Sequence, residues 1–372
     1  MLEYLNQYGN VSLAQAPLND VDLAIFAELV YCPVEQIAHP EGLSLKELSL
    51  AMEKPGEQDV TQVRFSYQMR DQQRLREALA RAQRYDGVRI KAFRCTFDDP
   101  GQIQFAALAL EAEGDAIVIY RGTDNTLAGW KEDFNLAYME RIPAQEMAVS
   151  FLEEMLEDAN AGRVCGHSKG GNLALYAAAR CREEIRAKIQ CVLSLDGPGL
   201  HESVIGSAGY ARVADRLRLI IPRASLVGLL FEQPESVRIV ESTVLGLHQH
   251  DPMTWKTSGM DFLNARDQTR TGKLLGQAVR RLIDRMPVEM REDFVEAIYE
   301  IIRATGAETV NDLVRGWLKN TVPVMRQRYH SDPEKYEVIQ KTALLFWLSA
   351  AETFGEALPD RLQQQLRERL SK

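Results

Sequence analysis

Cysteine is scarce in this sequence, and its arrangement excludes two common roles. Five cysteines occur among 372 residues: Cys32, Cys95, Cys165, Cys181 and Cys191. Their number is odd and none forms a Cys-x-x-Cys pair, so neither a disulfide framework nor a zinc site is expected. Cys165 and Cys191 lie in apolar runs, which indicates small core side chains.

Long hydrophobic runs and an export signal are also absent. The largely apolar stretch from Ala343 to Ala351 is well short of the roughly 20 residues that span a bilayer. The N-terminal MLEYLNQYGN carries acidic and amide side chains where a secretory signal has a basic segment and an apolar core. These absences predict a cytoplasmic protein without a transmembrane segment.

Positive charge is in deficit. Lys and Arg number 44 against 53 Asp and Glu, which gives a net charge of -9. An acidic surface repels phosphate backbones, so nucleic-acid binding is not expected. The composition, 45% hydrophobic and 26% charged, is that of a globular protein, and the chain is long enough for one large core plus an appendage.

Hydrophobic patterning divides the chain into three regions. Residues 1–99 are predicted to be largely helical, with Asn19-Asp20 capping a helix that begins near Val21. Strand-like and helical segments alternate from about 100 to 256, which favours a largely parallel sheet with helices on both faces. Residues 261–372 read as helices throughout. We therefore expect a domain over 1–260 and a C-terminal helical extension over 261–372.

The α/β region contains these predicted elements. Strands are expected at 103–110, 116–120, 163–165, 191–195, 217–221 and 237–240, helices at 144–159 and 172–180, and a hairpin turn at Gly114-Asp115.

The string Gly166-His167-Ser168-Lys169-Gly170-Gly171 contains Gly-x-Ser-x-Gly. An apolar strand precedes it and a helix-forming run follows, which is the setting of a nucleophile elbow. A serine at a helix N-terminus lies in a partial positive charge that favours a developing oxyanion. Ser168 is therefore the candidate nucleophile, and a glycine-rich turn with a capping serine is the competing interpretation.

A serine nucleophile requires a base, usually a histidine held by a carboxylate, in the chain order Ser, Asp or Glu, His. His248 and His250 follow the last predicted strand, and we favour His250 because Asp251-Pro252 indicates a fixed turn beside it. Asp196 ends the strand 191–195, at the carboxyl edge where active sites of open α/β sheets lie. Asp251 is the alternative acid.

The oxyanion requires two hydrogen-bond donors. The backbone N–H of Lys169 is one candidate because it follows the nucleophile. Thr123, in the Arg121-Gly122-Thr123 string after the strand 116–120, is the other. The competing interpretation is that this string only ends a strand and caps the next segment.

These strings together resemble the class 3 lipases of the α/β-hydrolase superfamily and, in Asp196-Gly197-Pro198-Gly199 and His250-Asp251-Pro252, the bacterial Mbeg-like hydrolases. The resemblance covers about 103–255 and includes Trp130 to Phe134. It implies an α/β-hydrolase fold, Ser168 as nucleophile and Thr123 as oxyanion donor. The acid departs from the class 3 pattern, because Ile221 to Ser225 contains no carboxylate. Lys169 replaces the commoner leucine, and either favours an acidic substrate or is solvated.

The function expected is hydrolysis of an ester-type acyl bond in a small ester or lipid, without metal or cofactor. Two alternatives remain open: a catalytically inactive scaffold that binds a partner through its helical C-terminal region, and a thioesterase or peptidase with the same mechanism.

Overall fold

The computed structural model describes residues 1–52, 66–98, 103–123, 139–225, 227–229, 237–287 and 289–293, together with the single residues 132, 136, 296 and 342. Two compact units divide the chain. The first comprises 1–124 and 140–268, and the second comprises 125–139 and 269–372. Within the described residues, no helix is long and apolar enough to cross a membrane.

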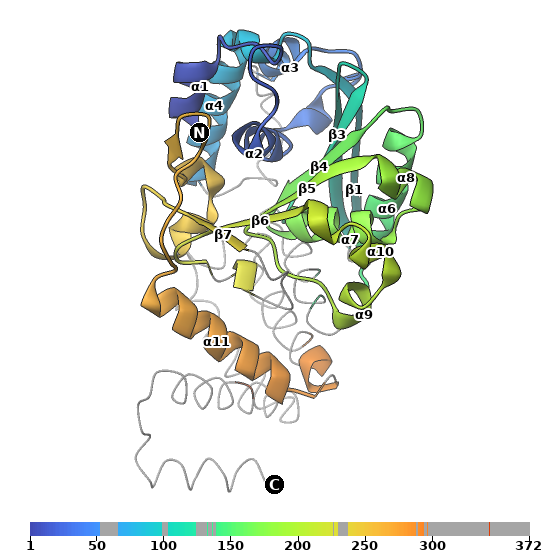
Figure 1. Cartoon of the computed structure of the whole chain (residues 1–372), viewed down its shortest axis with the longest axis vertical. Helices are drawn as coiled ribbons and strands as arrows, with labels where there is room; N and C mark the ends of the chain where they lie inside the picture. The colour runs from blue at the N-terminus through green and yellow to red at the C-terminus, as the bar shows by residue number, and fades with distance from the viewer. Residues whose placement is uncertain are drawn as a thin grey trace, which may run out of the picture. The chain divides into compact units, whose positions relative to one another are not determined.

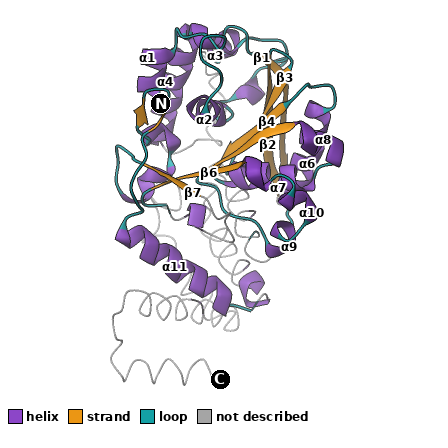
Figure 2. Cartoon of the chain, in the orientation of Figure 1, coloured by secondary structure: helices purple, strands orange, loops and turns teal. Residues whose placement is uncertain are grey.

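The first unit contains one large sheet and its helices (Figures 1 and 2). Its strands are β1 (Arg89–Asp98), β2 (Ile103–Ala112), β3 (Asp115–Tyr120), β4 (Gly162–His167), β5 (Ile189–Leu195), β6 (Leu217–Pro222), β7 (Val237–Val240), β8 (Thr257–Ser258) and β9 (Asp261–Phe262). Its α-helices are α1 (Leu2–Tyr8), α2 (Asp20–Leu29), α3 (Leu45–Ala51), α4 (Ser66–Arg81), α6 (Pro143–Leu156), α7 (Lys169–Arg180), α8 (Glu183–Lys188), α9 (Glu202–Ile205) and α10 (Ala208–Ala211). Short 3-10 turns include η1 (Val34–Gln36), η3 (Gln83–Tyr85), η4 (Ala214–Arg216), η5 (Val227–Leu229), η6 (Gly246–His250) and η7 (Pro252–Thr254).

The seven strands of the large sheet follow one another in chain order, from β1 at one edge to β7 at the other. β1, β2 and β3 pair antiparallel, and β3 to β7 pair parallel. Right-handed crossovers between successive parallel strands place their helices on one face of the sheet. α6 and α7 pack together on that face, while α2 lies against the other face (Figure 1). The expected α/β-hydrolase fold, a mostly parallel sheet flanked by helices, is confirmed.

Both faces of the parallel strands are buried, as continuous apolar runs predict. Ile117, Ile119 and Cys165 belong to the core on the α2 face. Tyr120 points to the other face, where its hydroxyl donates to the carbonyl of Ala148 in α6 at 2.6 Å. The alternation along β3 therefore fixes which residues meet which helix layer.

The predicted cap of α2 is confirmed. Asn19 accepts hydrogen bonds from the N–H groups of Val21 and Asp22, and Asp22 accepts one from the Asn19 N–H. Asp22 is fully buried and pairs with Arg84 at 2.6 Å, which ties α2 to the turn after α4. Such a pair is stable only when its remaining hydrogen bonds are made, and Tyr4 and Tyr85 supply two of them to Asp22.

Three local predictions are corrected. The N-terminal region, predicted to be largely helical over 1–99, ends in a strand, because Arg89–Asp98 forms β1. The hairpin turn lies at Glu113-Gly114, both with positive φ, one residue before the predicted Gly114-Asp115. The region after residue 260 is not helical throughout, because Asp261–Phe262 pairs with β8.

The second unit contributes one long described helix, α11 (Arg270–Arg285), whose N-cap Thr269 accepts a hydrogen bond from the Gly272 N–H. The predicted boundary at residue 260 stays a prediction, and most of the predicted C-terminal helices lie outside the described residues.

Candidate active site

Ser168 lies on a sharp turn between β4 and α7. Its φ of 58° and ψ of -130° are unusual for a residue with a side chain, and such a conformation costs on the order of 1–3 kcal/mol. Hydrogen bonds on both sides stabilise the turn: the Ser168 N–H donates to the Leu195 carbonyl at 3.0 Å, and the Gly171 N–H donates to the Ser168 carbonyl at 2.8 Å. Ser168 precedes the first residue of α7, so its hydroxyl lies at the positive end of the helix dipole.

Two glycines make this turn possible because backbone approaches backbone on either side. A Cβ on Gly166 would overlap the carbonyl oxygen of Gly170, and a Cβ on Gly170 would overlap the carbonyl oxygen of Tyr120. The sequence requirement for glycine before and after the serine is therefore steric.

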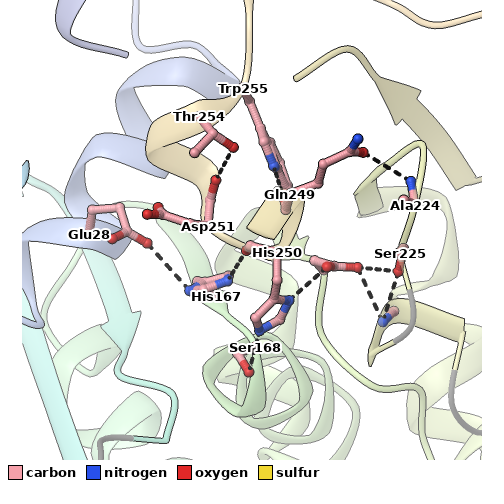
Figure 3. A network of polar contacts seen from close by, with 12 residues as sticks. Glu28, His167, Ser168, Ala224, Ser225, Gln249, His250, Asp251, Thr254 and Trp255 are labelled. Atoms are coloured by element: carbon pink, nitrogen blue, oxygen red, sulfur yellow. Dashed lines mark hydrogen bonds and ion pairs between the residues drawn. The ribbon is translucent and has the colours of Figure 1, made fainter. Parts of the chain in front are cut away.

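The structure brings Ser168, His250 and Asp196 into one hydrogen-bonded chain. His250 Nε2 lies 3.1 Å from the Ser168 hydroxyl oxygen, and His250 Nδ1 lies 2.7 Å from Asp196 Oδ2 (Figure 3). Asp196 is 1% exposed at the end of β5, and His250 ends η6. Three segments far apart in the sequence thus meet at the carboxyl edge of the sheet.

Residues 79–300, more than half of the chain, match the sequence model of the Mbeg1-like family. The chain belongs to the Mbeg1-like family. Two solved structures resemble this Mbeg1-like protein distantly. The M37 lipase is 14% identical, with 57% of this chain and 70% of that one covered and a TM-score of 0.37. The Lip2 lipase from Yarrowia lipolytica is also 14% identical, with 68% and 87% covered and a TM-score of 0.36. No curated protein sequence matches the chain significantly.

Asp196 of the Mbeg1-like chain is held at its other carboxylate oxygen as well. The Ser225 hydroxyl donates to Oδ1, and so does the Gly228 N–H, at 3.1 Å. Both donors follow β6. Ser225 ends the Ile221 to Ser225 segment, which lacks a carboxylate, and Gly228 lies in the turn η5 that comes next. Sequence reasoning missed this role because serine and glycine after a strand have no distinctive spacing.

The loop that carries His250 is fixed by its neighbour Gln249. The Gln249 side chain accepts a hydrogen bond from the Ala224 N–H at 3.0 Å and donates to the Val244 carbonyl at 2.9 Å. The buried Trp255 donates its indole N–H to the Gln249 carbonyl at 2.7 Å. This loop is therefore connected to the same β6 loop that holds Asp196.

The two alternative residues occupy other places. His248 is exposed, and its carbonyl accepts a hydrogen bond from the Asp251 N–H. Asp251 is buried and caps η7, where its Oδ1 accepts a hydrogen bond from the Met253 N–H at 2.8 Å. Of the two candidate histidines, His250 lies within hydrogen-bond distance of Ser168, and of the two candidate acids, Asp196 lies within hydrogen-bond distance of His250.

The Arg121-Gly122-Thr123 segment lies beside the elbow. A Cβ on Gly122 would lie 3.1 Å from the Ser168 Cβ, so this segment borders the serine directly. Gln104 of β2 approaches it from the other side, with its side-chain amide 3.5 Å from the Gly122 carbonyl oxygen.

The expectation for the Lys169 side chain is wrong. Lys169 is 1% exposed, and its ammonium donates to the Gln104 carbonyl at 2.9 Å and to the Gln104 side-chain oxygen at 2.8 Å. The ammonium group is neither solvated nor presented to a substrate, because its hydrogen bonds to Gln104 link α7 to β2.

Asn172 is a further site residue that sequence reasoning missed. Its side chain accepts a hydrogen bond from Gln145 of α6 at 2.8 Å and donates to the Gly199 carbonyl at 2.6 Å. It thereby attaches the loop that follows Asp196 to α7. Among the described residues, no group of three or more His, Cys, Asp or Glu side chains is arranged to hold a metal ion.

Proposed function

We propose that this protein is a serine hydrolase that cleaves an ester-type acyl bond in a small ester or lipid. Ser168 is the nucleophile, His250 the general base and Asp196 the carboxylate that orients the base. The hydrogen-bonded chain from the Ser168 hydroxyl through the His250 ring to the Asp196 carboxylate, at 3.1 and 2.7 Å, is the observation that carries the proposal.

The proton path follows from these contacts. A carboxylate only accepts, so His250 Nδ1 donates to Asp196 and Nε2 keeps a lone pair toward Ser168. As the Ser168 oxygen attacks the acyl carbon, its proton passes to Nε2. The tetrahedral intermediate collapses when the leaving alkoxide takes that proton, which leaves an acyl-enzyme. A water molecule repeats the two steps and releases the acid. The mechanism requires no metal or cofactor.

Two donors stabilise the oxyanion in this proposal. The Lys169 N–H is the first of α7, and N–H groups in the first turn have no partner within the helix. Thr123 supplies the second donor, and the close approach of Gly122 to Ser168 supports its place beside the nucleophile.

The test is active-site labelling combined with ester hydrolysis. A fluorophosphonate probe should label the wild type, and p-nitrophenyl esters of graded acyl length should be hydrolysed with a preference for one length. Ser168→Ala should abolish labelling and lower turnover by several orders of magnitude, roughly 10³-fold or more. Ser150→Ala, on the exposed face of α6, is the matched control and should keep both activities.

A wild type that neither labels nor hydrolyses esters would overturn the proposal in favour of a catalytically inactive scaffold. Labelling without ester hydrolysis would instead direct the search to thioesters and peptides. A cytoplasmic location stays a prediction from the sequence.

A further inference from the structure

A second histidine, His167, lies directly beside the proposed base. The two ring centroids are 4.7 Å apart, and His167 Nε2 lies 2.8 Å from the main-chain carbonyl oxygen of His250 (Figure 3). His167 is 6% exposed and belongs to β4, immediately before the nucleophile. Its ring therefore connects the end of β4 to the loop that carries His250.

Helix α2 and the turn after it supply the other side of His167. Glu28 Oε1 lies 3.3 Å from His167 Nδ1, and the Tyr31 hydroxyl lies 3.3 Å from the same nitrogen. The Tyr31 hydroxyl donates to the His167 carbonyl at 3.3 Å and accepts from the Gly122 N–H at 3.0 Å. Tyr31 thus bridges the serine elbow and the proposed oxyanion segment.

The protonation state of His167 follows from what faces its two nitrogens. A main-chain carbonyl only accepts, so the contact to His250 requires a hydrogen on Nε2. Nδ1 faces the Glu28 carboxylate, which only accepts when it is ionised. The Tyr31 hydroxyl has one hydrogen and lies 3.3 Å from both the His167 carbonyl and Nδ1; when it donates to the carbonyl, it presents a lone pair to Nδ1 as well. A lone pair on Nδ1 would be repelled by the ionised carboxylate, whereas a hydrogen on Nδ1 gives His167 the positive charge that pairs with Glu28 at 3.3 Å.

We propose that Glu28 and Tyr31 are positioning residues for the hydrolase site, and that His167 is a doubly protonated imidazolium that pairs with Glu28 and holds the backbone of His250. The proposal rests on the proposed function only in its kinetic consequences. Through His167, one helix end fixes the elbow, the base and the oxyanion segment relative to one another, which is the preorganisation that acyl transfer needs.

Other charged groups lie near the His167 and His250 rings and also influence the charge that these rings carry. Asp196 faces His250 Nδ1, and the buried Asp251 follows His250 in the chain. Burial lowers the pKa of the Met1 amino group, and the charge of Asp251 opposes that shift. The Glu28 carboxylate offsets the positive charge that the proposal places on His167, so His250 can accept a proton beside it.

Nitrogen-15 NMR of the histidine rings in the full chain tests the protonation state without reference to activity. The chain has six histidines, and loss of one signal set in His167→Gln assigns the ring. Wild-type His167 should show hydrogens on both nitrogens at neutral pH, and Glu28→Gln should leave one, on Nε2. A singly protonated His167 in the wild type would overturn the proposal.

Kinetics test the positioning role. Glu28→Gln and Tyr31→Phe should each lower kcat by about tenfold and leave KM within about twofold, because the base and oxyanion donors are used in the transition state. Two matched controls should keep kcat. Glu153→Gln removes an exposed ion pair with Arg182. Tyr4→Phe removes a buried hydroxyl that hydrogen-bonds at the other end of α2.

An equal fall of kcat in the variants and the controls would indicate general destabilisation and contradict the positioning role. A wild type that neither reacts with the fluorophosphonate nor hydrolyses esters would overturn the enzymatic function alone, since the NMR result on His167 would still stand.

Discussion

Asp196 uses both oxygens of its carboxylate, and its backbone is adjusted to allow this. Its φ is +46°, an uncommon value for a residue with a Cβ, and its N–H donates to the Ile220 carbonyl at 2.8 Å. Oδ2 accepts from His250 while Oδ1 accepts from Ser225 and Gly228. The strand end thus turns a fully buried carboxylate toward the imidazole in one orientation.

Replacing Asp196 with asparagine should preserve the shape of the site and change the histidine tautomer. An amide N–H facing His250 Nδ1 would favour a lone pair there and a hydrogen on Nε2, which cannot then accept the serine proton. We expect kcat for ester hydrolysis to fall by roughly 10³–10⁴-fold. Steady-state kinetics and the rate of fluorophosphonate labelling measure it.

Asp251→Asn is the informative comparison, because Asp251 was the alternative acid. Its carboxylate caps η7, and because an asparagine amide oxygen caps a helix about as well, the substitution should cost less than the roughly 1 kcal/mol that loss of the cap would. A small fall in the urea midpoint with at most a modest fall in kcat is expected. A larger kinetic loss in Asp251→Asn than in Asp196→Asn would contradict the assignment.

The five thiols should differ sharply in reactivity. Cys95 is exposed on β1, whereas Cys32, Cys165, Cys181 and Cys191 are buried. Burial raises the pKa of Cys181 and of Cys191 to about 11, so little thiolate forms in the folded protein at neutral pH. A thiol reagent should modify one cysteine per native chain and five after denaturation. Rapid modification of several native thiols would contradict the buried placement.

At the scale of single residues, the sequence identifies site residues that have a local sequence signature, but not those that reach the site through tertiary packing. Ser168 is marked by its neighbours in Gly-x-Ser-x-Gly, and the base and acid were each narrowed to two candidates by strand position. Glu28 and Tyr31 carry no such mark. They meet His167 across a separation of more than 130 residues, and only the packing of α2 on β4 brings them together.

At the scale of elements, the predicted strands with continuous apolar runs are all present, and β1 is the strand of the large sheet that was missed. Its residues are mostly half-buried or exposed, because β1 is an edge strand that pairs only with β2. Without a buried face, the sequence Arg89 to Asp98 has neither the apolar run nor the clean alternation that marks a strand. β1 forms because it pairs with β2, and this pairing is a non-local contact that the sequence of the strand alone does not reveal.

The N-terminus of α7 packs on the end of β3 more closely than side chains permit. Gly170→Ala would push a Cβ into the Tyr120 carbonyl oxygen, so the helix must shift away from the sheet. We expect a loss of at least about 2 kcal/mol in the free energy of unfolding, and with it the alignment of Ser168. Urea unfolding and ester hydrolysis should both report the change.

Gly206→Ala provides the matched control. Its added Cβ would meet only the Glu202 carbonyl oxygen, at 3.4 Å, and its φ of -72° suits alanine. Its stability and activity should remain close to those of the wild type. An equally small effect at Gly170 would show that α7 can move without cost.

At the scale of the whole molecule, alternation of strands and helices was sufficient to predict the sheet and its two helical layers. The same pattern could not predict that helix α2 of the N-terminal region, rather than a crossover helix, covers the second face. Strand order also required coordinates, since right-handed crossovers permit several orders. The local rules of the chain therefore specify the parts, and long-range packing specifies their arrangement.

The buried core should make the protein sensitive to alkali. Burial raises the pKa of the Tyr85 and Tyr120 phenols well above 10 and of the Cys181 and Cys191 thiols to about 11. In the unfolded chain these groups lose protons from about pH 9 upward, while the folded chain retains them. The unfolded state then binds fewer protons, so the free energy of unfolding falls as pH rises, by roughly 2–5 kcal/mol between about pH 8 and about pH 10.5.

Urea midpoints across this range, with phenolate absorbance as a second signal, measure the effect. Tyr120→Phe separates it from general charge repulsion. That variant loses the hydrogen bond to Ala148, about 1 kcal/mol at neutral pH, but one fewer group titrates on unfolding, so its stability should fall less steeply above about pH 10. Parallel pH curves for the two proteins would contradict a buried Tyr120 phenol, and a urea midpoint that stays constant from neutral to alkaline pH would contradict the buried thiols as well.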